Sequence, residues 1–302
     1  MLFESENVNY KITEAEARKK IDEMNLINGF LFDSIMDDKE DARILISRIL
    51  GVVFNRKISA IEVEAQKEFK PVDTPFHGIR LDAFAEEKTG RLITSVYDVE
   101  MEDRAADKPS LPRRLRYYTS LSDNKLLSSG RDYTDLPDYT SITILSYDPF
   151  SAGDMYYEAG TVLTSHNNLE YDDGICHIYL YCNGKINESM NNEHGKRIHE
   201  LLKYLVSGDK PETDNADIKD IDDLVLKTKQ KKEITRRYMK QWDRENQIRR
   251  EVREETKLEL AKTVIRFNRN HDISDEETKD YLQNELLIAS EYIDGLLNEE
   301  KS

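Results

Sequence analysis

Apolar residues in the first fifty positions of the chain recur with the period of an α-helix. They form two groups, within residues 30–36 and 44–50, and Gly29 and Gly51 stand at the edges of these groups. Glycine is common where helices begin or end, because it adopts backbone conformations that other residues avoid. The pattern predicts two helices between residues 13 and 51 that cover a core.

The periodicity then changes to the twofold alternation of β-strands. Residues 58–64 alternate imperfectly, residues 77–85 contain few strand breakers, and residues 92–102 are rich in β-branched and aromatic side chains. Residues 86–91 have the composition of a turn, so the two longer segments are predicted to pair as a hairpin. Three later apolar runs of strand length are bounded by turn residues: 141–147, 157–163 and 175–181.

Helices are predicted between and after these strands. One opens near Pro109 and Pro112, because proline suits the first turn of a helix, and another covers residues 193–206. Residues 208–217 have the composition of a linker, and residues 218–298 have helical character throughout. The order of elements indicates an α/β protein with a mixed central sheet flanked by helices and a helical C-terminal extension.

Chain length fits this organisation. A chain of 302 residues suits about two domains. We divide it into an N-terminal segment at 1–20, an α/β domain at 21–208, a linker at 209–217 and a helical extension at 218–302. The helical extension is also the candidate surface for homo-oligomerisation.

The net charge and the lengths of the apolar runs limit the partners and the compartment that we expect for this protein. The net charge is -16, from 44 Lys and Arg against 60 Asp and Glu, which disfavours loose binding to polyanions but leaves room for a local basic patch or a bound metal. No run reaches the roughly 18 apolar residues of a membrane helix, and the acidic start differs from a signal peptide. Cys176 and Cys182 suit reduced thiols. We expect a cytoplasmic protein that does not bind membranes.

Carboxylates concentrate on the predicted hairpin. With a period of two, Asp98, Glu100 and Glu102 share one face of the second strand, and Asp82 lies on the first strand. If the strands pair, Asp82 can lie beside Glu100 or Glu102, and a hard divalent cation such as Mg²⁺ would relieve the repulsion between these like charges. The other interpretation is a solvated strand face whose carboxylates point outward. Solvent exposure is expected for Asp98 in particular, with a loosely coupled helper role as its alternative.

Longer phrases around these acids resemble the bacterial PD-(D/E)XK family transposases, also called Rpn-type recombination-promoting nucleases. The phrases are Gly78-Ile-Arg-Leu-Asp82, Val96-Tyr-Asp-Val-Glu-Met101, Leu111-Pro-Arg-Arg-Leu-Arg-Tyr-Tyr118 and Asp132-Tyr-Thr-Asp-Leu136. Two shorter phrases, Asn28-Gly-Phe-Leu-Phe32 and Asp148-Pro-Phe150, fit the same family. Each motif is degenerate, but their order and spacing together are specific, and the resemblance covers the chain from about Ile27 to the tail.

The resemblance implies a restriction-endonuclease-like core in which Asp82 and Glu100 bind Mg²⁺. The third catalytic position of this family usually carries Gln or Lys, whereas this chain has Glu102. A carboxylate cannot supply a positive charge to the attacking water, although it can act as a general base or as a further metal ligand. The catalytic residues that the resemblance implies are therefore Asp82, Glu100 and Glu102. No glycine-rich nucleotide motif occurs, so no nucleotide cofactor is expected.

Three arginines open the helix that follows the hairpin: Arg113, Arg114 and Arg116. Arginine makes bidentate contacts with phosphates, and a helix N-terminus adds partial positive charge. These side chains either clamp a DNA backbone beside the metal or form salt bridges with the acidic hairpin, and both interpretations stay open.

The residues and the resemblance together predict a Mg²⁺-dependent DNA endonuclease that hydrolyses phosphodiester bonds. Its partner is DNA, and its expected role is that of a transposase-like, recombination-promoting nuclease. The alternative is a catalytically inactive DNA-binding or scaffolding protein that retains the nuclease fold.

Overall fold

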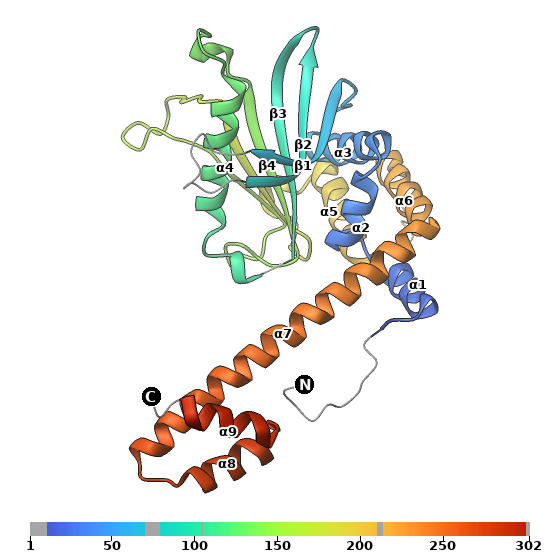
Figure 1. Ribbon diagram of the computed structural model, residues 1–302. Coiled ribbons are helices and arrows are strands. Elements are labelled where there is room, and N and C mark those ends of the chain that lie inside the picture. Colours follow the sequence, from blue (N-terminus) through green and yellow to red (C-terminus); the bar gives the residue numbers. More distant parts are fainter. Residues whose placement is uncertain (1–10, 70–78, 104, 210–213, 300–302) are drawn as a thin grey trace. The chain divides into compact units, whose positions relative to one another are not determined.

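The computed structural model forms two compact units (Figure 1). The residues that it describes are 11–69, 79–103, 105–209 and 214–299. One unit comprises Lys20–Ile234, and the other comprises Met1–Lys19 with Thr235–Ser302. The first contains a mixed sheet flanked by helices and the second is helical, so the expected α/β class and the helical C-terminal region are confirmed.

Six strands of the described residues form one sheet in the order β1-β2-β3-β4-β6-β5. The strands are β1 (Ile61–Phe69), β2 (Ile79–Thr89), β3 (Leu92–Glu102), β4 (Asp138–Leu145), β5 (Tyr156–Ala159) and β6 (Ile175–Tyr181). The pairs β1–β2, β2–β3 and β5–β6 are antiparallel, whereas β3–β4 and β4–β6 are parallel. Strands β2 and β3 are the predicted hairpin, and Gly90 has a φ of 66° at its turn, a conformation that glycine adopts readily.

Helices precede, interrupt and follow the sheet. They are α1 (Glu14–Glu23), α2 (Gly29–Met36), α3 (Lys39–Phe54), α4 (Leu111–Leu126), α5 (Glu193–Ser207), α6 (Ala216–Lys229), α7 (Lys232–Asn270), α8 (Asp275–Asn284) and α9 (Ser290–Glu299). Short 3₁₀ turns are η1 (Ala105–Asp107), η2 (Tyr133–Asp135) and η3 (Glu188–Met190).

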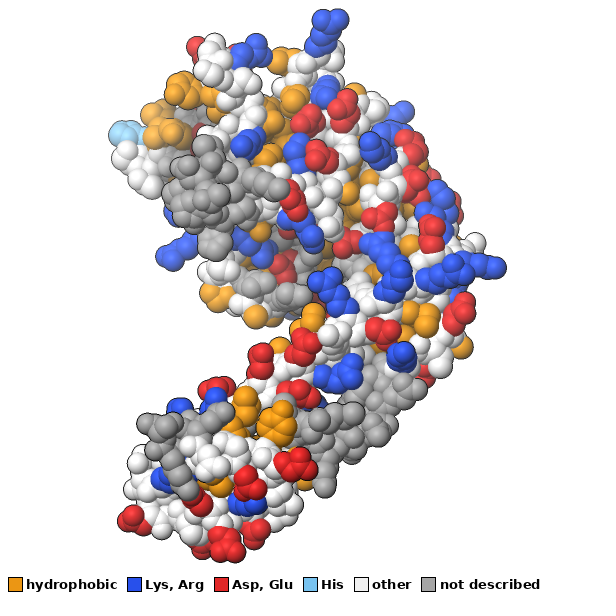
Figure 2. All heavy atoms as spheres, in the orientation of Figure 1, with side chains coloured by type: hydrophobic (Ala, Val, Ile, Leu, Met, Phe, Trp, Pro, Cys, Tyr) orange, Lys and Arg blue, Asp and Glu red, His pale blue; other side chains and the backbone are white. Residues whose placement is uncertain are grey.

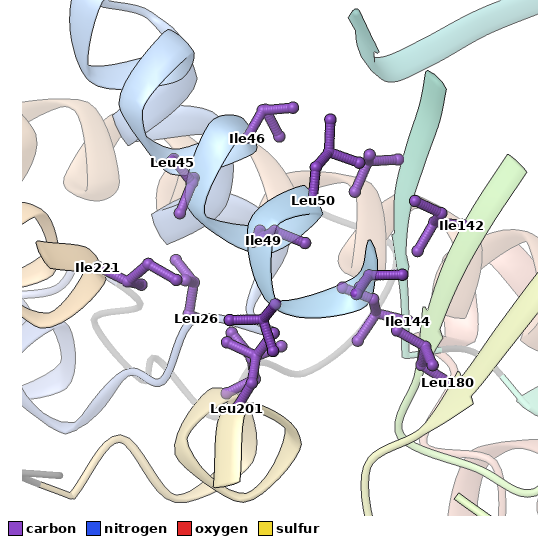
Figure 3. Packing of buried hydrophobic residues seen from close by; sticks show 14 of the residues in the cluster. Leu26, Leu45, Ile46, Ile49, Leu50, Ile142, Ile144, Leu180, Leu201 and Ile221 are labelled. Carbon is purple, nitrogen blue, oxygen red and sulfur yellow. The ribbon is translucent and has the colours of Figure 1, made fainter. Parts of the chain in front are cut away.

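Helices α2, α3, α5 and α6 cover one face of the sheet. Their apolar side chains form the main core with side chains from the strands, among them Ile142 and Ile144 of β4 (Figure 3). Ile49 of α3 is fully buried in this core. An ion pair also joins α6 to α3, because Lys227 Nζ lies 2.6 Å from the buried carboxylate of Asp41.

Helix α4 covers the opposite face. Its Leu111 and Leu115 pack with Leu145 and Tyr179 of the sheet. The end of β1 and the start of β2 also reach this side of the molecule. Their apolar side chains form a cluster with β3, β4 and α4 that contains Phe69, Ile79, Leu81, Phe84, Val96, Tyr139, Tyr117, Tyr118 and Leu121. On this side of the sheet Asp98 and Glu100 are buried, whereas Asp82 and Glu102 are half-buried.

Several boundaries differ from the sequence-based expectation. Strand β1 begins three residues later than residues 58–64 suggested and continues to Phe69, and β5 is Tyr156–Ala159, which overlaps only the start of the predicted 157–163. Gly51 does not end its helix, because α3 continues to Phe54 and Asn55 adopts the left-handed conformation at its C-terminus. Residues 77 and 78 of the predicted strand lie outside the described residues.

The two units do not separate at the linker expected between 209 and 217. Helix α6 begins at Ala216, inside that segment, and its Ile218, Ile221, Leu224 and Val225 are buried in the main core with α2 and α3. The α/β unit accordingly extends to Ile234. The composition of the segment is that of a linker, but apolar packing on both sides of it keeps the flanking helices in one unit.

The other unit is built on the long helix α7. Apolar residues of α7 pack with α8 and α9 around Ala261, Ile265 and Leu282. Helix α8 begins with a capping box, since Ser274 caps α8 and exchanges hydrogen bonds with Glu277. Among the helices that the structure describes, none is both long and apolar enough to cross a membrane.

Truncation of the buried Ile49 side chain is expected to destabilise the α/β unit. Ile49→Ala should lower the free energy of unfolding by about 2–5 kcal/mol, because it removes packed apolar atoms and leaves a cavity. Urea unfolding followed by circular dichroism measures the change. Leu226→Ala on α6, where the side chain is half exposed, is the matched control, and an equal loss in both variants would contradict the core described here.

Candidate active site

The register of β2 and β3 brings Asp82 and Glu100 together. Ala83 pairs with Val99 and Phe84 with Asp98, so the next position along the ladder sets Asp82 opposite Glu100. The N–H of Asp82 donates to Glu100 Oε1 at 2.9 Å, and the N–H of Met101 donates to Asp82 Oδ2 at 3.3 Å. Each carboxyl is thus held by the main chain of the opposite strand. The two residues predicted to share a site are neighbours in the structure.

Asp98 lies on the same face as Glu100, but its environment differs from the expectation. The expected solvent exposure is wrong, because Asp98 is 0% exposed beneath the α4 side of the sheet. The Tyr139 hydroxyl donates to Asp98 Oδ2 at 3.1 Å, whereas Oδ1 has no hydrogen-bond partner among the described residues. The side chain of Asp98 also interacts with the carboxyl of Glu100, and two buried carboxyl groups this close are stable only when a proton or a cation offsets their charge.

Burial is the main reason that these carboxyl groups titrate abnormally. It raises the pKa of Asp82 to about 6 and the pKa of Asp98 to about 7. It also raises the pKa of Glu100 well above its ordinary value, and the nearby charges of Asp98 and Asp82 add to this effect. The three groups therefore favour a state in which protons or a cation offset their negative charge.

Glu102 and Arg114 form an ion pair at the edge of this cluster. Arg114 Nη2 of α4 donates to Glu102 Oε2 at 2.8 Å, and both side chains are largely buried. This is the salt-bridge interpretation of the three arginines, realised at Arg114. Arg113 and Arg116 are exposed on α4. The structure therefore brings Glu102 to the site together with a cation from the covering helix.

The sequence interpretation missed two polar residues beside Asp82. Gln66 of β1 donates from Nε2 to Asp33 Oδ1 of α2 at 2.8 Å. The charge of Asp33 contributes to the raised pKa of Asp82, which indicates that the two carboxylates are near one another. A single acid within the otherwise apolar helix sequence GFLFDSIM was the available signal for Asp33. No comparable local signal marks Gln66.

The donor set has the chemistry that Mg²⁺ prefers. Mg²⁺ binds oxygen ligands, commonly one or two carboxylates, and keeps several waters. Asp82 and Glu100 offer two carboxylates from neighbouring strands, and burial together with the neighbouring acids raises the pKa of both groups, so a cation there would offset crowded negative charge. Among the described residues, no three acidic, His or Cys side chains are already arranged as metal ligands. The residues fit a two-carboxylate site completed by water better than a closed protein cage.

The surface visible in Figure 2 has mixed charge. Lys and Arg side chains are interspersed with Asp and Glu side chains over the α/β unit on the face shown. Contacts with a polyanion on such a face depend on a few individual cations, because neighbouring carboxylates oppose broad electrostatic attraction.

Comparisons of the chain with protein-family models, with curated proteins and with solved structures found no match. The functional argument is therefore made from the residues and their geometry.

The metal-free protein should lose stability as the pH rises from 5 to 8. Between these values the buried carboxyls keep protons that the unfolded chain releases, so the folded state binds more protons and the free energy of unfolding falls with pH. Asp98→Asn removes one such group. It should stabilise the protein by on the order of 1 kcal/mol at pH 8 and by much less at pH 5.

Urea unfolding in a chelator at both pH values measures this difference. Asp138→Asn, at an exposed position of β4, is the matched control and should leave the pH dependence unchanged. If Asp98→Asn retains the pH dependence of the original protein, the buried carboxyl does not titrate as described.

Proposed function

We propose that this protein is a Mg²⁺-dependent DNA endonuclease with a restriction-endonuclease-like core. The observation that carries the proposal is the cross-strand pair Asp82 and Glu100, held by reciprocal main-chain hydrogen bonds in a largely buried setting. The resemblance of the surrounding phrases to the PD-(D/E)XK family transposases supports the same reaction. It also suggests a role in DNA breakage and recombination within the cytoplasm.

In this proposal Asp82 and Glu100 hold the cation. A bound Mg²⁺ lowers the pKa of water and neutralises charge on a phosphodiester. The main-chain N–H groups of Asp82 and Met101 orient the two carboxylates from opposite sides of the ladder. Tyr139 fixes the neighbouring Asp98, so the floor of the site is held by hydrogen bonds before any ligand binds.

Glu102 and the arginines supply the other roles. Glu102 accepts a proton from the attacking water, and its ion pair with Arg114 fixes the carboxylate in place. The exposed Arg113 and Arg116, on the first turns of α4, bind the phosphates that flank the scissile bond. The proposed partner is DNA, as the resemblance to the family transposases implies, and its regularly spaced phosphates suit contacts with two neighbouring arginines.

A second candidate is a catalytically inactive DNA-binding or scaffolding protein. The observation that favours it is the ion pair between Glu102 and Arg114, which engages the third catalytic position in a structural contact. Under this candidate the carboxylates beneath α4 are a remnant of the nuclease fold, and the arginines retain their phosphate contacts.

Plasmid nicking separates the two candidates. The original protein should nick supercoiled DNA with Mg²⁺, and Asp82→Asn should reduce the rate on the order of 100-fold or more, because it removes a ligand charge while keeping the side-chain shape. The matched control is Glu62→Gln, an exposed acid on β1 paired with Lys88, which should retain activity. Equal, background-level nicking by all three folded proteins would favour the inactive candidate.

The salt dependence of DNA binding tests the arginines. Each phosphate contact contributes about 0.9 to the slope of log affinity against log salt. So acidic a chain can neutralise few phosphates, so the slope should be shallow, and the combined change Arg113→Gln and Arg116→Gln should reduce that slope by about two. Lys196→Gln, which removes an exposed cation paired with Glu193 on α5, is the control. An unchanged slope in the arginine variant would place the phosphate contacts elsewhere.

A further inference from the structure

Strand pairing places two tyrosines in line with Glu100 of the candidate site. Glu100 of β3 pairs with Thr143 of β4. Thr143 pairs with Tyr179 of β6, which in turn pairs with Tyr157 of β5. Tyr179 and Tyr157 lie in one apolar cluster with Leu111 of α4, so their side chains are on the face of the sheet that α4 covers. Neighbouring strands are about 5 Å apart, so the backbone of Tyr179 is about 10 Å from that of Glu100.

Phe150 packs on these two tyrosines from the segment that follows the C-terminal end of β4. The centre of its ring lies 5.1 Å from that of Tyr157 and 5.0 Å from that of Tyr179, and both contacts are edge-to-face. Such contacts fix the position of an aromatic ring. Tyr179 is almost fully buried, whereas 46% of Phe150 is exposed. The Phe150 ring is therefore held in a fixed position and is still accessible to a ligand.

The side chain of Asp148 holds the loop that carries Phe150. Asp148 Oδ1 accepts hydrogen bonds from the N–H of Phe150 at 3.0 Å and from the N–H of Ser151 at 2.8 Å. Asp148 Oδ2 accepts from the N–H of Gly153 at 2.7 Å, and the Tyr157 hydroxyl donates to Oδ1 at 3.1 Å. One carboxylate thus joins the loop to a tyrosine that contacts the Phe150 ring. A ligand that binds this ring does not have to order the loop first.

A lysine contacts the same loop. Lys108 Nζ donates to Ser151 Oγ at 2.7 Å, and Lys108 stands shortly before α4, whose first turn carries the exposed Arg113. An ammonium group has three donors, so the contact with Ser151 leaves donors for a phosphate. Proteins bind single-stranded nucleic acids with this combination of groups, since cations contact the backbone and bases stack on aromatic rings.

We propose that Phe150 is a base-stacking residue of the proposed nuclease, and that the substrate of this nuclease is DNA with an unpaired base next to the scissile phosphate. This inference rests on the proposed function. A base within a duplex is covered by its neighbours, so only an unpaired base can lie against the Phe150 ring. The span of about 10 Å between Glu100 and Tyr179 allows a nucleotide next to the scissile phosphate to reach this ring. Lys108 contacts the backbone of the same strand.

A purely structural role of Phe150 makes a different prediction from a stacking role. If the ring serves only to cover Tyr157 and Tyr179, leucine should replace it without a change in DNA binding. If a base stacks on the ring, Phe150→Leu should keep the fold and lose affinity for unpaired DNA. Phe150→Trp should keep that affinity, because tryptophan also offers an aromatic face.

The test measures binding of the full chain to a labelled oligothymidine by fluorescence anisotropy, in a chelator that prevents cleavage. Phe150→Leu should raise the dissociation constant about tenfold, which is the contribution expected from one stacked base, and should not change the affinity for a duplex of the same length. An abasic oligomer keeps the phosphates and lacks the bases, so the original protein and Phe150→Leu should bind it equally. Tyr133→Leu, at an exposed ring before β4, is the matched control and should bind like the original protein.

Equal affinity of the original protein and of folded Phe150→Leu for oligothymidine would overturn the inference. A tenfold loss that persists on the abasic oligomer would overturn it as well, because the ring would then act without a base. Should the leucine variant unfold in urea too readily to be compared, a loss of oligothymidine affinity in Phe150→Trp would contradict stacking. Affinity that depends on Phe150, without cleavage in Mg²⁺, would overturn the nuclease reaction and support the binding of unpaired DNA.

Discussion

The antiparallel register between β2 and β3 is the constraint on which the candidate site depends. It sets Asp82 opposite Glu100 and keeps Asp98 on the same face, beneath α4. Because side chains alternate along a strand, a slip of one residue would turn Asp82 into the apolar face that holds Ala83 and Val99. The β2–β3 pairing therefore places apolar side chains in the main core on one face of the sheet and carboxyl groups on the other face. The negative charge of these carboxyl groups must be offset by protons or by a cation.

The hairpin and the meeting of Asp82 with Glu100 could be predicted, because both follow from local alternation and turn composition. The burial of Asp98 could not, since it depends on which face α4 covers, and α4 lies outside the hairpin. Asp33 and Gln66 lie 33 positions apart in the sequence, and no sequence pattern indicates that glutamine takes a left-handed backbone. The boundary of the α/β unit also depends on distant packing, through the contact of α6 with α2 and α3.

Glu102 stands where the nuclease pattern that the chain resembles usually has Gln or Lys, and Arg114 of α4 pairs with it. A strand residue with a positive charge would have placed a cation directly on β3. Here a carboxylate stands on the strand and the cation arrives from α4, at 2.8 Å. The Glu102–Arg114 pair is neutral as a whole, so the positive charge at this position comes from α4 and not from β3. In the proposed nuclease, Glu102 acts as a base while it stays in contact with Arg114.

The docking of α6 on α2 and α3 determines which pieces of this chain can exist by themselves. A fragment that stops at Gly208 would lose Ile218, Ile221, Leu224 and Val225 and would leave the apolar sides of two other helices in water. It would also leave the buried Asp41 without the ammonium group of Lys227. Such a fragment would be prone to aggregate. A fragment that continues to Ile234 would keep these apolar surfaces buried under α6.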